Sequence, residues 1–595
     1  MNKLLRSHQA ILTAVGALLG GVGCTEFDLY AEIAAHVGSC DPTPPDPEPV
    51  DPSDVFYSPD HLVEVKVEMA PADWETLRHE GRSLLDAWEG KAWEYDYTKF
   101  NGSVTVDGTR YENVEVRKKG FNGSISIPRP SLKIDLASSV SSQNHAGIKK
   151  LTFNNNRQDP SNTHQCMAYG LFNKAGIPTP RCNLAHVVVN DEDLGIYTNI
   201  EAINKQLLSR YFDDNSGNLY EGEAADFERA SVDRIALKTN EKVNDRTDLE
   251  PVVAALEGSD EQLVSALGAK IDLDSFRTYW AMEVLVGHWD SYSGNANNYW
   301  IYDDPTNKKF YFMPWGTDSA FEGPNTYNGP NSSITVFAKG KISNRLYRLQ
   351  EQRELYRKRL GELNDTVWEE RALLAEVDRV AKLAPKTSPD VLEKQRSIIR
   401  NHPAQLRAAL AEPAPEWIET ANQPVSPCNG MRSDLQSDFQ TTWGDLATMA
   451  PGVGTFTFNM SLDGVPLPQA TWFGMAGTDP TMGPDSLLRM MGILPDGRLL
   501  WLQFTMPAVT VTPGVQPFHG FESWGTLSII EGQSFRFLGA VSDGAITFNQ
   551  AATQPNAPVV GSIAGRLLQF GCLNEPTQPV TEPTPVEPAP VEAAN

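Results

Sequence analysis

The sequence predicts an α+β body followed by a small all-β domain. From about residue 57 to residue 150, short segments such as residues 62–67 alternate apolar and polar side chains, which is typical of strands. Residues 342–411 carry apolar side chains at three- and four-residue spacing, the pattern of helices that pack on a core. Between residues 428 and 572 short strands recur, several begin at a glycine, and helix signals are nearly absent. We expect this last region to fold as a β-sandwich.

The first 24 residues have the pattern of a signal peptide. A short basic stretch precedes an apolar run from Ala10 to Val22, which is too short to span a membrane as a permanent helix. The run ends at Gly21-Val22-Gly23-Cys24, which resembles a bacterial lipoprotein signal except that Gly21 stands where leucine is usual. We therefore expect an exported protein anchored to a membrane by lipid on Cys24. Ordinary secretion with cleavage nearby is the alternative.

Three further segments have a linker composition. Residues 25–54 contain an acidic, proline-rich stretch, and we interpret this segment as an extended tether. Residues 412–427 separate the body, residues 55–411, from the all-β domain, residues 428–572. Residues 573–595 are rich in proline, glutamate, threonine and valine and are predicted to be a disordered tail.

Length and charge limit the classes of function. A chain of 595 residues has room for two to three domains with large cores. Its formal net charge of −26 argues against a nucleic-acid-binding protein, because phosphate contacts need a surface rich in lysine and arginine. The same charge favours solubility outside the cell.

The cysteines agree with export. Cys428 and Cys572 bracket the all-β domain, so we expect them to form a disulfide. Cys166 and Cys182 flank a passage from a helix to a strand and could form a second one. Cys40 would then be free, unless Cys24 is not lipidated and pairs with it.

The most informative stretch runs from residue 288 to residue 321. Asp290 is followed five residues later by Asn295, the spacing of a protein-kinase catalytic loop, and Asp318 follows after a predicted strand hairpin. Phosphoryl transfer needs one carboxylate that accepts the hydroxyl proton. It also needs an amide oxygen and a second carboxylate that hold Mg²⁺ on the phosphates. This segment contains all three groups.

Other blocks occur in the order of one family. They are Val116 to Ser124 with Pro130 to Asp135, Leu151 to Ser161, Val188 to Glu201, and Gly217 to Glu221. With the Trp-Asp…Asn-Asn-Tyr and Pro-Trp-x-x-Asp blocks, the chain resembles the CotH (spore-coat protein H) kinase family over roughly residues 55 to 410.

The resemblance implies an atypical, two-lobed protein kinase that uses ATP and Mg²⁺ or Mn²⁺ and acts on an exported protein. Asp290 matches the proton acceptor, and Asn295 and Asp318 are the expected metal ligands. Lys119, which precedes a Gly-x-x-Gly-Ser turn, and Lys133, in an alternating strand, are candidates to contact the phosphates. Glu201 is a candidate to orient one of these lysines.

One departure supports an alternative. Many members of the family read Pro-Trp-Asp-x-Asp, whereas here Gly316 replaces the first aspartate and Asp318 is the second. If the first aspartate holds the metal, the site is damaged; if the second does, it is intact, and we favour Asp318. The alternative is an inactive adhesin or scaffold of the same fold that binds protein or glycan partners.

Overall fold

The computed structural model describes residues 51–83, 95–121, 124, 126–322, 333–417, 428–446, 454–462, 465–466, 471–479, 486–520, 523–532 and 534–573. The predicted signal peptide with Cys24, the tether up to residue 50 with Cys40, most of the linker and the tail from residue 574 lie outside the described residues. The chain divides into two compact units. The first comprises residues 1–77, 96–119 and 129–419, and the second comprises residues 78–95, 120–128 and 420–595.

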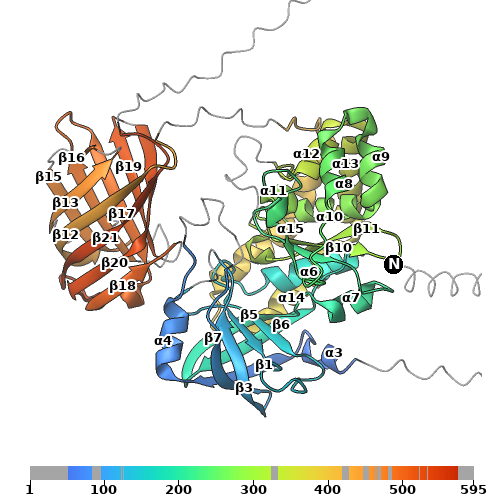
Figure 1. The fold of residues 1–595 in the computed structure, drawn as a ribbon, viewed down its shortest axis with the longest axis horizontal. Helices are drawn as coiled ribbons and strands as arrows, with labels where there is room; N and C mark the ends of the chain where they lie inside the picture. Colours follow the sequence, from blue (N-terminus) through green and yellow to red (C-terminus); the bar gives the residue numbers. More distant parts are fainter. Residues whose placement is uncertain are drawn as a thin grey trace, which may run out of the picture. The chain divides into compact units, whose positions relative to one another are not determined.

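The first unit begins with a lobe of strands (blue to teal in Figure 1). Seven strands form a closed barrel in the order β1-β2-β3-β4-β5-β7-β6. Their bounds are β1 (Leu62–Met69), β2 (Phe100–Val106), β3 (Thr109–Lys118), β4 (Leu132–Asp135), β5 (Lys150–Asn154), β6 (Cys182–Val189) and β7 (Glu192–Ile200). The alternation read from the sequence has a direct cause, because Val63, Val65 and Val67 are buried in the barrel core while the residues between them face outward.

The chain enters this lobe earlier than the predicted end of the tether. Residues 51–54, expected to be extended, belong to the folded unit, because helix α3 (Pro52–Phe56) begins there. The Asp51 carboxylate accepts a hydrogen bond from the Ser53 backbone N–H at 2.9 Å and so caps the helix. A short helix, α4 (Pro71–His79), follows β1.

The second lobe of the first unit is mostly helical (teal to yellow in Figure 1). Its helices are α6 (His164–Lys174), α7 (Lys205–Tyr211), α8 (Glu250–Glu257), α9 (Asp260–Lys270), α10 (Leu273–Leu285), α11 (Tyr292–Asn295), α12 (Lys341–Arg348), α13 (Gln350–Thr366), α14 (Glu370–Leu383) and α15 (Pro389–Ala411). A four-stranded sheet has the order β11-β10-β8-β9 and comprises β8 (Leu219–Gly222), β9 (Ala236–Leu237), β10 (Tyr299–Asp304) and β11 (Lys309–Pro314). The predicted helices between residues 342 and 411 correspond to α12–α15. One large core joins these elements apart from α7, whose buried residues belong to a smaller cluster. Within the large core Trp280 stacks on Tyr356 with ring centroids 3.8 Å apart.

The second unit is all-β in residues 428–573, as predicted, but it is not a sandwich of two stacked sheets (orange to red in Figure 1). Its strands are β12 (Arg432–Asp445), β13 (Gly454–Leu462), β14 (Val465–Pro466), β15 (Thr471–Thr478), β16 (Ser486–Ile493), β17 (Leu499–Met506), β18 (Gly514–Phe518), β19 (Trp524–Glu531), β20 (Ser534–Gln550) and β21 (Pro558–Gln569). Because β12 pairs with both β21 and β13, the single sheet closes on itself around one apolar core.

Both expected disulfides are present, Cys428–Cys572 in the second unit and Cys166–Cys182 in the first. Within the described residues, the structure contains no helix that is both long enough and apolar enough to cross a membrane.

Candidate functional site

The hairpin of β10 and β11 brings the two predicted aspartates together. Asp290 precedes β10 and Asp318 follows β11, and the ends of an antiparallel hairpin are neighbours. Two bonds tie these ends: His288 Nε2 pairs with the Trp315 carbonyl at 3.0 Å, and the Trp315 N–H donates to the Asn298 carbonyl at 3.1 Å. Burial is the main cause that raises the pKa of Asp318, and the charge of Asp290 adds to that rise.

Asp290 is held by three asparagine side chains. Asn295 donates to Oδ1 at 2.9 Å, Asn297 donates to both carboxylate oxygens at 3.1 Å, and Asn298 donates to Oδ2 at 2.8 Å. Burial raises the pKa of Asp290, whereas these amides and the charge of Lys339 oppose that shift. The asparagine cluster therefore fixes the orientation of the carboxylate. Asn295, predicted as a metal ligand, contacts Asp290 through its amide nitrogen in this structure.

A buried glutamate supports the loop that carries Asp290. Glu283, on α10, accepts hydrogen bonds from the backbone N–H groups of Tyr292 at 3.1 Å and Ser293 at 3.0 Å, at the start of α11. Burial raises the pKa of Glu283 to about 7. The Tyr292 hydroxyl in turn donates to Asp226 at 3.0 Å, which fixes the other side of the same turn.

Asp318 lies in a short 3-10 helix, η2 (Thr317–Ser319), and is buried. Its Oδ2 accepts from Nδ2 of Asn154, at the end of barrel strand β5, at 3.3 Å. Its backbone carbonyl accepts from Nδ1 of His164, on α6, at 2.7 Å. Burial raises the pKa of Asp318 to about 6, and the nearby charge of Lys119 opposes this rise.

The glycine that departs from the family pattern has a structural reason. Gly316 has a φ of +52°, a left-handed conformation that favours glycine. An aspartate here would collide with Asn298, whose side chain holds Asp290. Of the two aspartate positions in the family pattern, this backbone therefore accommodates the one at Asp318, which remains the candidate metal ligand.

The barrel contributes a group of cations, of which Lys119 lies near Asp318. Arg117 and Lys133 are cross-strand neighbours on β3 and β4, and they alternate with residues that point into the barrel core. Lys119, just after β3, lies on the same face, with its Nζ 6.0 Å from the centroid of the Trp315 ring. Glu221, on β8, is the carboxylate close to this group, and it forms an ion pair with Lys238 at 3.0 Å.

Burial destabilises the charged forms of Lys119 and Lys133. Burial lowers the pKa of Lys119, against the opposing charges of Asp318 and Glu221. Burial also lowers the pKa of Lys133 to about 8, with a contribution from the positive charges of Arg117 and Lys119. An excess of positive charge in a partly buried place favours an anionic ligand.

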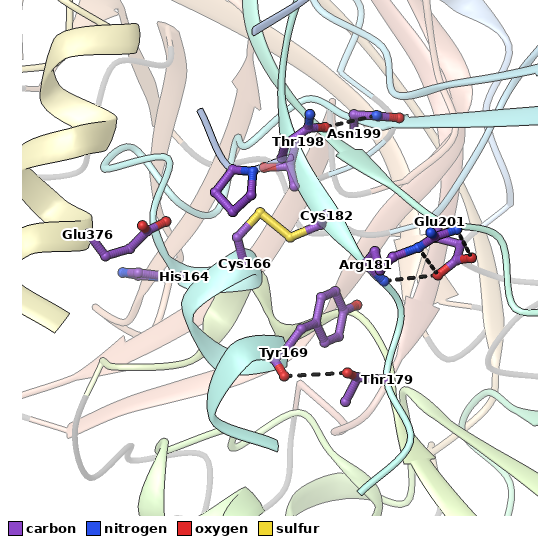
Figure 2. The surroundings of a disulfide bond; sticks show 12 residues. His164, Cys166, Tyr169, Thr179, Arg181, Cys182, Thr198, Asn199, Glu201 and Glu376 are labelled. Atoms are coloured by element: carbon purple, nitrogen blue, oxygen red, sulfur yellow. Dashed lines mark hydrogen bonds and ion pairs between the residues drawn. A yellow bond between two sulfur atoms is a disulfide. The ribbon is translucent and has the colours of Figure 1, made fainter. Parts of the chain in front are cut away.

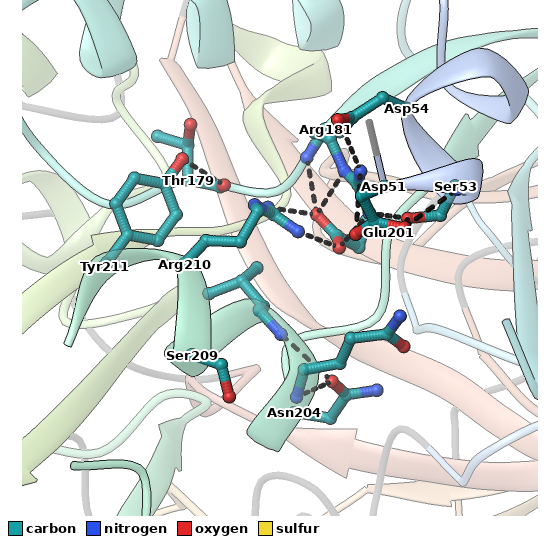
Figure 3. Close-up of polar contacts among 12 residues, drawn as sticks. Asp51, Ser53, Asp54, Thr179, Arg181, Glu201, Asn204, Ser209, Arg210 and Tyr211 are labelled. Carbon is teal, nitrogen blue, oxygen red and sulfur yellow. Dashed lines mark hydrogen bonds and ion pairs between the residues drawn. The ribbon is translucent and has the colours of Figure 1, made fainter. Parts of the chain in front are cut away.

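Glu201 does not orient a lysine, and this expectation is corrected. Its buried carboxylate accepts hydrogen bonds from Arg181, with Oε1 at 2.8 Å from Nη2, and from both terminal nitrogens of Arg210 (Figure 3). Burial alone would raise the pKa of Glu201, but hydrogen bonds and charge from Arg210 and Arg181 outweigh it and hold the pKa below its usual range. Arg181 also contacts Asp54 and Ser53, so this cluster fastens α3 to the barrel.

The oxygen ligands at this site suit a hard cation that is held by few protein groups. Within the described residues, no group of three or more His, Cys, Asp or Glu side chains is arranged to hold a metal ion. Mg²⁺ commonly uses one or two carboxylates and completes its coordination with water and phosphate oxygens. Asp318, with Asp290 and amide oxygens nearby, matches that requirement, and the lysine group beside it suits phosphates.

Several residues of the site escaped sequence reasoning. Asn154 stands in an Asn-Asn-Asn run to which the sequence alone assigns no role, and its place at the end of a strand is the signal that could have found it. His164 and Glu283 come from distant segments and have no motif of their own, and Glu221 ends the Gly217–Glu221 block, which by itself assigns it no role. Only the folded chain brings His164 to Asp318, Glu283 to the loop of Asp290, and Glu221 to the lysines.

Known proteins are similar to this chain over part of its length. Residues 116–406, just under half of the chain, match a family model described as CotH kinase protein. Invasin CotH7 of Rhizopus delemar is 25% identical over 175 residues, which cover 28% of this chain and 29% of that protein. Inner spore coat protein H of Bacillus subtilis is 21% identical over 188 residues, which cover 29% of this chain and 51% of that protein. The chain thus spans less than a third of the first of these relatives and about half of the second.

Among solved structures, the proinflammatory kinase CtkA of Helicobacter pylori matches with 11% identity and a TM-score of 0.28, over 49% of this chain and 92% of that one.

Proposed function

We propose that the first unit transfers a phosphoryl group from a metal-bound nucleoside triphosphate, ATP in the simplest case, to a hydroxyl group of a protein. The observation that carries the proposal is the convergence of Asp290 and Asp318 at the two ends of one hairpin, with Lys119 of the barrel lobe near Asp318. The match of residues 116–406 to a kinase family supports it.

Each group has a distinct role in this proposal. Asp290, held by three amides, would accept the proton of the attacking hydroxyl. Asp318 would hold Mg²⁺ or Mn²⁺, which when bound neutralises charge on the phosphate oxygens. Lys119 and Lys133 would contact the phosphates, and Glu221 takes the position near them that was expected of Glu201.

The setting of the reaction is also a proposal. The signal-like N-terminus favours export and a lipid anchor on Cys24, and the two disulfides of the described residues fit an oxidising compartment. The substrate would then be another exported protein. A kinase outside the cytoplasm must meet its nucleotide there or during transit.

A second function is carried by one observation. A matched relative is named as an invasin, which supports a surface protein that binds a partner without catalysis. The retained Asp290 and Asp318, and the half-buried Lys119 near Asp318, favour catalysis over this alternative.

Calorimetric titration of the full-length protein with ATP, with and without Mg²⁺, tests the proposal. We expect metal-dependent binding that Asp318→Asn abolishes and that Asp290→Asn leaves nearly unchanged, while Asp290→Asn removes transfer to protein substrates. Asp213→Asn, in an exposed turn, is the matched control and should change neither. Absence of nucleotide binding with either metal would reject catalysis and favour the binding protein.

A further inference from the structure

The disulfide Cys166–Cys182 joins the two lobes of the first unit. Cys166 is in the first turn of α6, whose buried residues Met167, Leu171 and Phe172 belong to the core of the helical lobe. Cys182 is the first residue of β6, whose buried residues belong to the barrel core. Figure 2 shows the bond between the α6 helix and the β6 strand.

The candidate site is itself divided between these lobes. Lys119, Lys133 and Asn154 come from the barrel, whereas Asp290 and Asp318 come from the helical lobe. The lobes meet directly where Asn154 donates to Asp318. The spacing between the lobes therefore sets the distance from Lys119 and Lys133, the candidate phosphate contacts, to the carboxylate of Asp318, the candidate metal ligand.

The N-terminal turn of α6 contacts Asp318 as well. His164, two residues before Cys166, donates to the Asp318 carbonyl at 2.7 Å. The His164 backbone N–H donates to the Asp159 carboxylate at 2.7 Å, which fixes the start of the helix. The segment that the disulfide ties to the barrel is thus the segment that contacts the backbone of Asp318.

A reductant can approach this bond. Both cysteines are half-buried and line a cavity of about 510 Å³. The lining also includes residues of α14 such as Leu373 and Glu376. Thiol–disulfide exchange needs a thiolate that reaches one of the two sulfur atoms, and a cavity lined by both half-buried cysteines offers a route to them.

We propose that Cys166–Cys182 is a redox switch of the candidate site, and this inference rests on the proposed function. Two molecules of a small thiol, or one dithiol, reduce the bond. The S–S bond breaks, Cys166 and Cys182 each gain a hydrogen as thiols, and the reductant becomes a disulfide. The lobes then lose this cross-link, remain joined by the main chain, and move apart, so that the site opens. The protein would be inactive in a reducing compartment and become active after it reaches an oxidising one.

The reduced protein keeps its fold in this proposal. The bond spans 16 residues, and α6 remains in place through its buried apolar face. We expect the affinity for Mg²⁺-ATP to fall about tenfold on reduction, because binding must then also restore the spacing of the lobes.

The test compares oxidised and dithiothreitol-treated full-length protein with Cys166→Ser/Cys182→Ser. Mass spectrometry of alkylated thiols identifies the bond that has opened. Calorimetry gives the affinity for Mg²⁺-ATP, and hydrogen exchange follows the amides of residues 153–157 and 317–320. We expect weaker binding and faster exchange both in the reduced protein and in the double variant. Cys428→Ser/Cys572→Ser, which removes the other disulfide, should behave as the oxidised parent does.

Two results would overturn the proposal. Unchanged affinity after alkylation at Cys166 and Cys182 would show that the bond does not control the site. If the oxidised protein binds no nucleotide, the proposed function fails, and hydrogen exchange then decides alone whether the bond holds the lobes together. Equal exchange in the oxidised and reduced forms would reject the switch in that case.

Discussion

Gly316 lies so close to Asn298 that a Cβ atom at position 316 would stand 2.6 Å from the Asn298 side-chain oxygen. Restoring the common family residue with Gly316→Asp should therefore damage the site instead of repairing it. The left-handed backbone costs about 1–2 kcal/mol for a residue with a side chain. Displacement of Asn298 also removes a hydrogen bond to Asp290. We expect slower phosphoryl transfer and a lower melting temperature.

Gly108 is the control that distinguishes backbone strain from a steric clash at position 316. Gly108 also has a positive φ, +79°, but a Cβ atom at position 108 would meet no other atom of the described residues within 4 Å. Gly108→Ala should lower the stability by a similar strain energy and leave transfer unchanged. A gain of activity in Gly316→Asp would contradict our assignment of the metal carboxylate to Asp318.

Lys133 should make nucleotide binding sensitive to alkaline pH. Its pKa is lowered to about 8 by burial, so its charge is lost as pH rises through that value. We expect the affinity of the parent protein for Mg²⁺-ATP to fall above pH 8, and that of Lys133→Met to be lower and nearly constant. Isothermal calorimetry between pH 7 and pH 9.5 measures both. Lys150→Met, on an exposed lysine of the next strand, is the control and should keep the profile of the parent.

The same lysine should lower the stability of the unbound protein. Its folded pKa lies below the unfolded value, so the unfolded state binds more protons between about pH 8 and pH 10.5. The free energy of unfolding therefore rises with pH in that window, and the full cost of the buried charge remains below pH 8. We expect Lys133→Met to be more stable than the parent by about 2 kcal/mol at pH 7. Equal denaturant midpoints would show that the charge is not buried in solution.

Glu201 should matter for folding and not for chemistry. Its side chain is 6% exposed, and Glu201→Gln leaves Arg181 and Arg210 without their buried carboxylate. We expect a loss of about 3 kcal/mol in the free energy of unfolding. The affinity of the folded protein for Mg²⁺-ATP should remain unchanged.

An exposed ion pair provides the comparison for Glu201. Glu250 pairs with Arg229 at the surface, and Glu250→Gln should cost less than about 1 kcal/mol. Because the pKa of Glu201 is held below its usual range, its contribution is complete above that range and is lost as pH falls through the folded value. A large fall in nucleotide affinity for Glu201→Gln would restore the lysine-orienting role that we reject.

Glu283 should act as a positioning residue for Asp290. Glu283→Ala removes the acceptor of two backbone N–H groups at the start of α11, so we expect a loss of about 2–4 kcal/mol and much slower transfer. Glu283→Gln retains an oxygen acceptor and should recover most of both. Chemical denaturation and a single-turnover assay measure the two effects. Equal rates for the alanine and glutamine variants would contradict the positioning role.

The sequence was a good guide wherever local pattern and packing agree. Period-two alternation in β1 and helical spacing in α12–α15 predicted those elements, because the same side chains fill the cores. Cysteine positions predicted both disulfides. The sandwich expectation failed because strand patterns are alike in open and closed sheets. The pairing of β12 with both β13 and β21 decides closure, and that pairing is not local.

In the site, Asp290 stood out because Asn295 follows it at the spacing of a kinase catalytic loop, and Asp318 stood out through the family pattern. Their convergence follows from the β10–β11 hairpin, which the structure shows. Glu201 was misassigned because a carboxylate can satisfy any nearby cation, and the nearest ones, Arg181 and Arg210, are recognisable only in the folded chain. Glu221 takes the position near the lysines through the pairing of β8 with β10.

The disulfide between Cys428 and Cys572 has a mechanical consequence. It joins the residues where the chain enters and leaves the closed ring of strands, and 144 residues separate them in sequence. A force applied at the two ends of this segment passes through one covalent bond and bypasses the hydrogen bonds between the strands. The ring should therefore transmit tension without unravelling, and reduction of this bond would expose the strands to the load.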